Sequence, residues 1–320
     1  MRAMGKELKG LLEGADKEGT LLVASRRSVA RTLSREVARG RVVSPIRGAF
    51  ADKTTWELLS AIERHLRCMR TLSNRHPNWV FAGFSAALVH GLSVSYSNLK
   101  EVQVASFTHA THAPSRGIRR LVIDGDEPVT IGGIQVTSLA RTVYDCLRLT
   151  DFRRGLALAD SALRVGGLSN DQLLEALNGH SSRIAGHDRA LQTVRHADPR
   201  SESGGESIAR AAMIELGYQL PDLQVWIPDK LGEAPPARVD FLWRLPQRTV
   251  AGELDGREKY VNPEMTNGRD AVDVLRDERL RESRLSAWNI QVMRFSFKDV
   301  CNDARFCKIL DSFEIPRVSA

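Results

Sequence analysis

The chain has 320 residues, 42% of them hydrophobic, and a formal net charge of +7. This length allows two or three domains with substantial apolar cores. Because no apolar run is long enough to span a bilayer and the chain starts without an apolar signal segment, we expect a cytoplasmic protein with no membrane partner. The spacing of the cysteines argues against a zinc finger or a disulfide framework.

The charge is divided unevenly along the chain. Residues 201–320 contain 17 Lys and Arg against 20 Asp and Glu, a balance of −3, which leaves 29 against 19, or +10, for residues 1–200. A basic front and an acidic back are typical of a phosphate-attracting module joined to a metal-holding one. Basic residues scattered over a surface would give the same totals.

A dense basic cluster lies between residues 26 and 47, a segment that contains seven arginines and one acidic residue, Glu36. Ser28 is expected to cap a helix that runs to about Arg39 and ends at Gly40. By the helical period, this helix has an apolar stripe and a cationic stripe roughly opposite to it. The two stripes are Val29, Leu33 and Val37, and Arg31, Arg35 and Arg39.

A short hairpin turning between Pro45 and Gly48 is expected to follow this helix. A helix followed directly by such a wing is typical of a winged helix-turn-helix domain, whose helix enters the major groove of DNA while the wing touches the backbone. The alternative is an ordinary amphipathic helix with a solvated polar face. The candidate nucleic-acid-binding residues are Arg26, Arg27, Arg31, Arg35, Arg39 and Arg47.

The winged segment resembles the N-terminal domain of abortive-infection type IV antitoxins. Arg39-Gly-Arg-Val-Val43 and Arg47-Gly-Ala-Phe-Ala51 match the two strand motifs of that family. A looser resemblance to the section that follows in the same family rests on Ser85-Ala-Ala-Leu-Val-His-Gly-Leu92 and Val136-Thr-Ser-Leu-Ala-Arg-Thr-Val-Tyr-Asp145. The middle section, 56–200, is therefore expected to combine a small sheet with helices.

A small, polar, glycine-rich stretch at 198–205 marks the expected start of the last domain. The helix that follows carries Glu206 at the edge of its apolar stripe. Two roles are open for this side chain. In a capping box with Ser203 it would satisfy a backbone amide, and otherwise it would contribute to an acidic site.

Two successive strands are predicted beyond this helix, the first carrying Asp240 and the second carrying Glu253 and Asp255. Residues i and i+2 of a strand share a face. Glu253 and Asp255 therefore project together, while Val250 and Leu254 face a core on the opposite side.

On its own strand, Asp240 is expected to lie on the face opposite Val239 and Phe241. Three carboxylates then converge on one side of a hairpin. Such a cluster repels itself unless a divalent cation neutralises it, and oxygen ligands suit Mg²⁺ or Mn²⁺ rather than zinc. The predicted metal ligands are Asp240, Glu253 and Asp255.

The block from Glu206 onward resembles the very-short-patch-repair-like branch of the PD-(D/E)xK nuclease superfamily. The resemblance implies a restriction-endonuclease-like fold, a mixed sheet flanked by helices, that hydrolyses DNA phosphodiesters with Mg²⁺ or Mn²⁺ as cofactor. The matching motifs follow the family's order: Glu206, Gly217-Tyr218, Pro221, Arg238-Val-Asp-Phe241, Glu253-Leu-Asp-Gly256, Lys259-Tyr260, Arg276-Asp-Glu-Arg-Leu-Arg-Glu282 and Trp288-Asn-Ile-Gln-Val-Met-Arg-Phe295.

The match departs from the superfamily at its lysine. Asp255 stands where that lysine is expected, and Lys259 is the candidate replacement. Residues 201–320 contain no histidine, so catalysis by histidine is excluded in this part and metal-activated water with lysine assistance is expected. Arginines of the next helix either hold flanking phosphates or form salt bridges with acids of their own helix. The candidate catalytic residues are Glu206, Asp240, Glu253, Asp255 and Lys259, and the helix arginines are Arg276, Arg279 and Arg281.

The sequence thus predicts a multi-domain α/β (α+β) protein that binds DNA and acts as a magnesium-dependent endonuclease. The resemblance also suggests two kinds of partner: a second copy of the chain in a homodimer, and a toxin or phage-defence component. The alternative is a non-catalytic regulator or antitoxin, whose winged helix binds an operator while the back domain serves dimerisation or sensing. The expected domains are a winged helix-turn-helix at 1–55, an antitoxin-like α+β and helical section at 56–200, and a restriction-endonuclease-like domain at 201–320.

Overall fold

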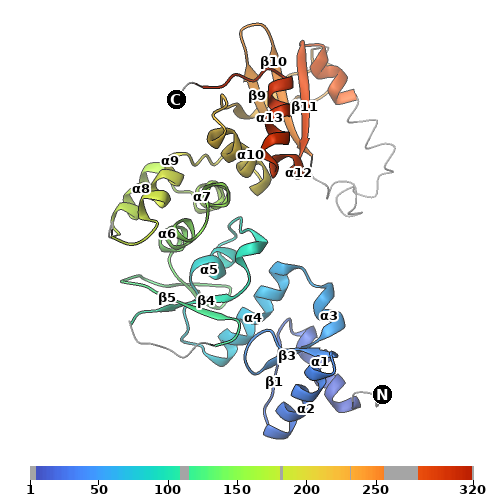
Figure 1. The fold of residues 1–320 in the computed structure, drawn as a ribbon, viewed down its shortest axis with the longest axis vertical. Coiled ribbons are helices and arrows are strands. Elements are labelled where there is room, and N and C mark those ends of the chain that lie inside the picture. The colour runs from blue at the N-terminus through green and yellow to red at the C-terminus, as the bar shows by residue number, and fades with distance from the viewer. Residues whose placement is uncertain (1–4, 109–114, 181–182, 231, 256–279, 319–320) are drawn as a thin grey trace. The chain divides into compact units, whose positions relative to one another are not determined.

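The protein folds as a mixed α/β chain with several small sheets (Figure 1). The structure, a computed structural model, describes residues 5–108, 115–180, 183–230, 232–255 and 280–318. Two compact units divide the chain: one comprises Met1–Thr150 and Asp171–Gln192, and the other Asp151–Asn170 and Thr193–Ala320. Within the described ranges, no helix has the length and apolar character needed to cross a membrane.

The first unit opens with a three-stranded antiparallel sheet of order β1-β3-β2 and two helices. Leu33 of the second helix is fully buried, and Val29 and Val37 pack against the same cluster. The predicted apolar stripe is therefore confirmed. The elements are α1 (Lys6–Lys17), β1 (Leu22–Val23), α2 (Arg27–Ala38), β2 (Val42–Val43) and β3 (Ala49–Asp52).

The start of α2 differs from the prediction, whereas its end agrees with it. The helix already includes Ser28, so Ser28 is not its cap; the N-cap position is Arg26, whose side chain makes no capping hydrogen bond. At the other end, Gly40 has a φ of 70°, a left-handed conformation that glycine adopts without a Cβ clash. The predicted end of the helix is confirmed.

The rest of the first unit combines a parallel strand pair, a hairpin and helices. Strands β4 and β5 are parallel, and β6 and β7 form an antiparallel hairpin. Phe81 and Met69 are fully buried in the largest core of this part. The elements are α3 (Lys53–Leu58), α4 (Ala61–Arg75), α5 (Gly83–Val89), η1 (Tyr96–Asn98), β4 (Val102–Ser106), β5 (Ile118–Val122), β6 (Val129–Ile131), β7 (Ile134–Val136), α6 (Leu139–Leu149), α8 (Asn170–Asn178) and α9 (His187–Arg195).

The second unit is built on a four-stranded mixed sheet of order β11-β10-β9-β8. Strands β10 and β11 are parallel, while β9 pairs antiparallel with both β10 and β8. A helical segment at 280–286 precedes β11. The elements are α7 (Phe152–Gly166), α10 (Gly204–Glu215), β8 (Asp222–Ile227), β9 (Ala237–Arg244), β10 (Thr249–Asp255), β11 (Ile290–Ser296), α12 (Phe297–Val300) and α13 (Asp303–Ser312).

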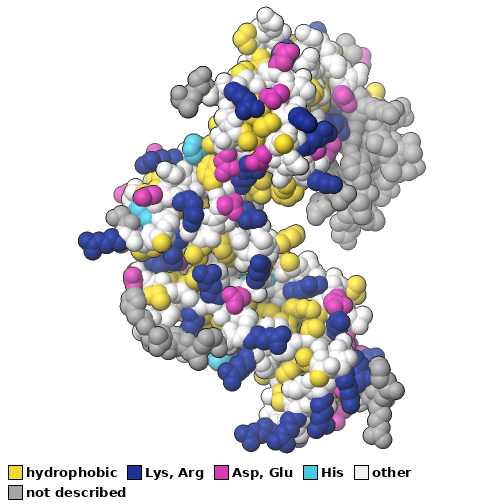
Figure 2. Space-filling view, viewed as in Figure 1, with side chains coloured by type: hydrophobic (Ala, Val, Ile, Leu, Met, Phe, Trp, Pro, Cys, Tyr) yellow, Lys and Arg dark blue, Asp and Glu magenta, His cyan; other side chains and the backbone are white. Residues whose placement is uncertain are grey.

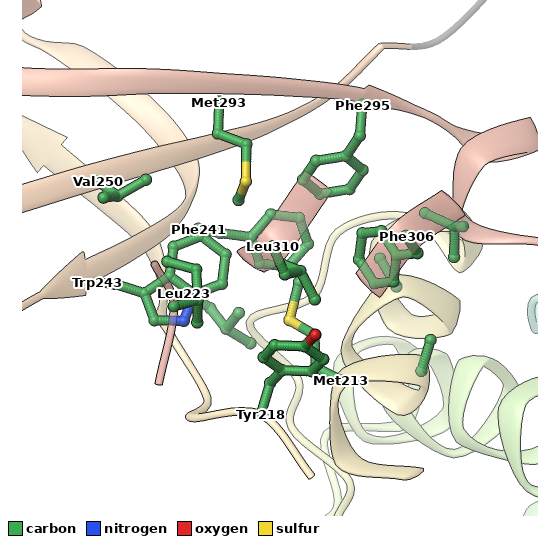
Figure 3. Close-up of a cluster of buried hydrophobic side chains, with 14 residues drawn as sticks. Met213, Tyr218, Leu223, Phe241, Trp243, Val250, Met293, Phe295, Phe306 and Leu310 are labelled. Atoms are coloured by element: carbon green, nitrogen blue, oxygen red, sulfur yellow. The ribbon is translucent and has the colours of Figure 1, made fainter. Parts of the chain in front are cut away.

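An aromatic core holds α10 and α13 against one face of this sheet (Figure 3). The ring centroid of Phe295 lies 5.9 Å from that of Phe241, in a stacked arrangement, and 5.2 Å from that of Phe306, which meets it edge-on. Aromatic contacts therefore join the strands to the helix. A smaller cluster on Val239 and Leu285 covers the other face. The sheet thus carries an apolar cluster on each face.

Helix α7 packs on α10 and belongs to the second unit. Asp160 of α7 is fully buried and accepts hydrogen bonds from Arg210 of α10 at 2.8 and 2.9 Å and from the backbone amide of Asp198 at 2.7 Å. The boundary placed at residue 200 from the sequence separates this helix from its partner. A glycine-rich stretch marks a bend in the chain but carries no information about a buried ion pair across it.

Candidate functional site

The regular alternation of side chains between the two faces of the sheet breaks in strands β8 and β9 at Gln224 and Asp240. The two strands pair in register on both sides of Gln224 and Asp240, and Gln224 has a φ of 53°, unusual for a residue other than glycine. Phe241 lies in the core beneath α10, whereas Val239 lies in the cluster on the opposite face. The prediction that both face away from Asp240 is therefore wrong, because it assumed regular alternation through this point.

The carboxylate of Asp240 is tied to the neighbouring strand. Its Oδ2 accepts a hydrogen bond from the backbone amide of Leu254 at 3.1 Å. The paired register of β9 and β10 ends just before this bond, at Phe241 and Gly252. The Asp240 side chain therefore takes the place of a strand partner where the two strands separate.

Glu253 and Asp255 lie on either side of Leu254. Val250 belongs to the core beneath α10 and Leu254 packs against it, so the face expected to be apolar is confirmed. Alternation then places Glu253 and Asp255 together on the other face of β10. The hydrogen bond to Leu254 brings Asp240 to the same end of the hairpin.

Two arginines surround Glu253, whose exposed fraction is 9%. Its Oε1 lies 2.7 Å from Nη2 of Arg281, and its Oε2 lies 3.7 Å from Nη2 of Arg294. Arg294 also approaches Asp255, with Nη1 3.7 Å from Oδ1. The negative charge predicted to require a metal is here balanced by guanidinium groups.

Arg294 and Gln224 were not identified from the sequence as site residues. Arg294 lies directly opposite Glu253 in the parallel register of β10 and β11, a pairing that its motif does not reveal. Arg281 was expected either to contact phosphate or to pair within its own helix. It instead binds Glu253 and donates to the backbone carbonyl of Arg238.

Glu206 combines features of both roles predicted for it. The Ser203 hydroxyl caps α10 by accepting from the Glu206 amide at 3.2 Å, but Oε2 of Glu206 accepts from the amide of Glu202 rather than from that of Ser203. The same oxygen accepts from the Gln224 amide group at 2.9 Å. The reciprocal capping box is therefore absent from this helix start, and Glu206 reaches β8 instead.

Close packing of α10 on β10 places Glu206 near Asp240. Gly205 precedes Glu206, and a Cβ added there would lie 2.7 Å from Cδ2 of Leu254, so the Leu254 side chain would have to move to admit a larger residue. Burial raises the pKa of the Glu206 carboxyl, and the charge of Asp240 raises it further. The negative charge of Asp240 therefore disfavours ionisation of Glu206 in addition to burial.

Replacing Glu206 by glutamine tests this raised pKa through the pH dependence of stability. A raised folded-state pKa means that folding binds a proton, so the contribution of Glu206 is present below its unfolded-state pKa and is lost as pH rises through the folded-state pKa. We expect Glu206→Gln to be more stable than wild type at pH 7, by about 1.4 kcal/mol for each tenfold change in the acid dissociation constant, and equal to it near pH 4. Urea unfolding at both pH values measures this, and a variant less stable at pH 7 would contradict it.

The structure relates the predicted acids to one another in two ways. Glu206 lies near Asp240, and Glu253 and Asp255 share Arg294. Among the described residues, no three His, Cys, Asp or Glu side chains are grouped so that they could hold a metal ion. Three of the predicted cationic residues lie outside the described ranges: Lys259, Arg276 and Arg279.

The arginines predicted to bind nucleic acid are exposed on the first unit, where Lys and Arg side chains gather (Figure 2). Arg39 forms an ion pair with Glu36 at 2.8 Å, and Arg41 binds the same acid. No ion pair to a described carboxylate involves the other five, which are Arg26, Arg27, Arg31, Arg35 and Arg47. The cationic stripe of α2 therefore faces solvent.

Comparison with known proteins finds two similar proteins of Mycobacterium tuberculosis, Uncharacterized protein MT2308 of strain CDC 1551 / Oshkosh and Uncharacterized protein Rv2248 of strain ATCC 25618 / H37Rv. Each is 34% identical to this chain over 133 residues, which cover 42% of this chain and 47% of the relative. The chain therefore spans about half the length of the curated relatives it matches. No family model and no solved structure matches the chain.

Proposed function

We propose that the first unit binds DNA through α2 and the β2–β3 wing. The observation that supports this most directly is the exposed row of arginines on α2, opposite the buried Leu33. Guanidinium groups that pair with no carboxylate of the described ranges can contact phosphates, and a helix beside a wing has the dimensions to enter a major groove. The paired Arg39 is less suited to this role than Arg31 and Arg35.

Replacing Arg31 and Arg35 together by alanine tests this proposal. Each phosphate contact contributes about 0.9 to the slope of log affinity against log salt, so we expect the slope to fall by about 2 and binding to weaken at low salt. Folding should be unchanged because both side chains are exposed. Fluorescence anisotropy with a duplex of mixed sequence at several salt concentrations measures the slope. An unchanged slope would exclude α2 from the interface.

We propose further that the second unit is a magnesium-dependent phosphodiesterase built on Asp240 and Glu253. Support comes from the hairpin, where the bond from Leu254 to Asp240 sets both acids at one end of the sheet. Their donor atoms are the hard oxygens that Mg²⁺ prefers, although Glu253 must first leave Arg281. Bound there, the ion would supply water activation and charge neutralisation during phosphodiester hydrolysis.

The chain's own residues would then have separate roles. Asp240 and Glu253 would hold the cation, with Asp255 beside them. Arg294, which already lies between Glu253 and Asp255, would supply the positive charge that the superfamily takes from its lysine. The strand register places Arg294 opposite Glu253, so its guanidinium would lie near a bound phosphate and could stabilise the negative charge that develops around the pentavalent phosphorus.

The second candidate function is a DNA-binding regulator without catalysis, favoured by the 2.7 Å contact between Arg281 and Glu253. In this case the arginines neutralise the acids permanently and stabilise the sheet. Incubating supercoiled plasmid with the full-length protein and Mg²⁺ or Mn²⁺ separates the two candidates. Metal-dependent nicking supports the phosphodiesterase, whereas tight binding without nicking of double-stranded or single-stranded DNA supports the regulator.

A further inference from the structure

A groove of about 530 Å³ runs along the first unit between α2 and the wing. Its lining includes Ala30, Val37 and Phe50, which give it a largely small and apolar floor. Two arginines from outside the helix and wing also line it: Arg75, the last residue of α4, and Arg116, just before β5. The groove is therefore shared between the predicted DNA-binding segment and the section that follows it.

The arginines of this groove have no acidic partner in the part of the chain that the structure describes. Arg47, Arg75 and Arg116 are all exposed, and the described residues that line the groove include no acid. None of the three forms an ion pair with a carboxylate of the described chain, whereas nearby Arg67 binds both Asp16 and Glu63. Three like charges around one groove repel each other, so an anion bound there would be stabilised by all of them.

The position of Arg75 is fixed by the wing itself. Its Nη1 donates a hydrogen bond to the backbone carbonyl of Arg47 at 3.0 Å. The next residue, Gly48, has a φ of 74°, so the wing turns tightly at this point and brings its backbone beside α4. The wing and the end of α4 therefore line the same side of the groove and are joined by this hydrogen bond.

From this arrangement we propose that the groove holds the sugar–phosphate backbone of DNA, with Arg75 and Arg116 as phosphate contacts beyond those of α2. A deoxyribose presents carbon atoms that suit the floor of alanine, valine and phenylalanine, and the adjoining phosphates suit arginines at the rim. This inference rests on the proposed DNA binding by the first unit and extends the contact surface into the middle section of the chain.

The experiment compares full-length protein with Arg75→Ala/Arg116→Ala in duplex binding at increasing salt. We expect the slope of log affinity against log salt to fall by about 2, as two phosphate contacts are lost, with sequence preference unchanged. Because Arg75 also supports the wing, Arg116→Ala alone is measured as well; it should lower the slope by about 1. Circular dichroism and thermal unfolding check that both variants fold.

A matched control removes the same charge elsewhere. Arg119→Ala/Arg195→Ala replaces two exposed arginines that do not line the groove, so it should keep the wild-type slope. If the groove variants and this control bind alike while Arg31→Ala/Arg35→Ala weakens binding, the groove inference fails and the proposed DNA binding stands. If wild type itself does not bind DNA, the proposed function fails first. Displacement of DNA by an acidic peptide but not by a polyphosphate would also overturn the groove inference.

Discussion

Glu253→Ala is expected to abolish the metal-dependent cleavage of plasmid DNA that the proposed function requires of the wild-type protein. Glu253 is only 9% exposed and forms ion pairs with both Arg281 and Arg294, so its carboxylate is central to the charge balance of the site. Losing a metal-holding oxygen should reduce the cleavage rate by at least about 10²-fold, the range seen when one preorganised electrostatic group is removed. The fraction of nicked plasmid against time, with Mg²⁺ or Mn²⁺ in excess, measures this loss.

Two further variants show whether the loss is specific. Glu233→Ala removes an exposed carboxylate from a loop of the same unit and should leave cleavage unchanged. Arg294→Ala should slow cleavage, since it removes the cation between Glu253 and Asp255, but metal-induced thermal stabilisation should persist. Full activity of Glu253→Ala would place the chemistry elsewhere in the chain. Full activity of Arg294→Ala would mean that another cation, such as Lys259, acts in its place.

The alternating pattern of the last third was sufficient to predict much of the sheet. Val250 and Leu254 face the core and Glu253 lies on the other face because β10 is a regular strand, for which a period of two holds. The same rule failed one strand away. Gln224 takes a positive φ, and the alternation of side chains breaks there and at Asp240. Val239 and Phe241, the neighbours of Asp240, therefore lie on opposite faces of the sheet. Nothing in the residue types indicates this break.

Contacts between segments that are far apart in the sequence could not be predicted from local patterns. The helix of Arg31 and Arg35 could be placed from local periodicity, and its exposed cationic face agrees with the prediction. Arg294 could not be assigned to Glu253, because a parallel register between strands separated by dozens of residues depends on tertiary packing. For the same reason a glycine-rich stretch was taken as a boundary, although the helix before it packs on the helix after it.

The pairing of those two helices leads to the largest stability effect we expect. Asp160 is fully buried and Arg210 is exposed by only 5%. Burial raises the pKa of the Asp160 carboxyl, even though Arg210 and the Asp198 amide act to lower it. The cost of removing this carboxylate from water therefore remains large, and the pair is stable only while both partners are present.

Asp160→Ala should accordingly lower the free energy of unfolding of the second unit by about 3–5 kcal/mol, because it leaves the Arg210 guanidinium buried without its carboxylate. Replacing both residues with apolar ones of similar size, as in Asp160→Leu/Arg210→Met, should recover most of that loss, since no buried charge then remains. Hydrogen–deuterium exchange of the α10 amides in the full-length protein, together with urea unfolding, measures both changes. A loss below about 1 kcal/mol for Asp160→Ala, with α10 exchange unchanged, would show that α7 is not an integral part of the second unit. The segment 151–170 would then behave as a linker, and the boundary near residue 200 would be the one that governs folding.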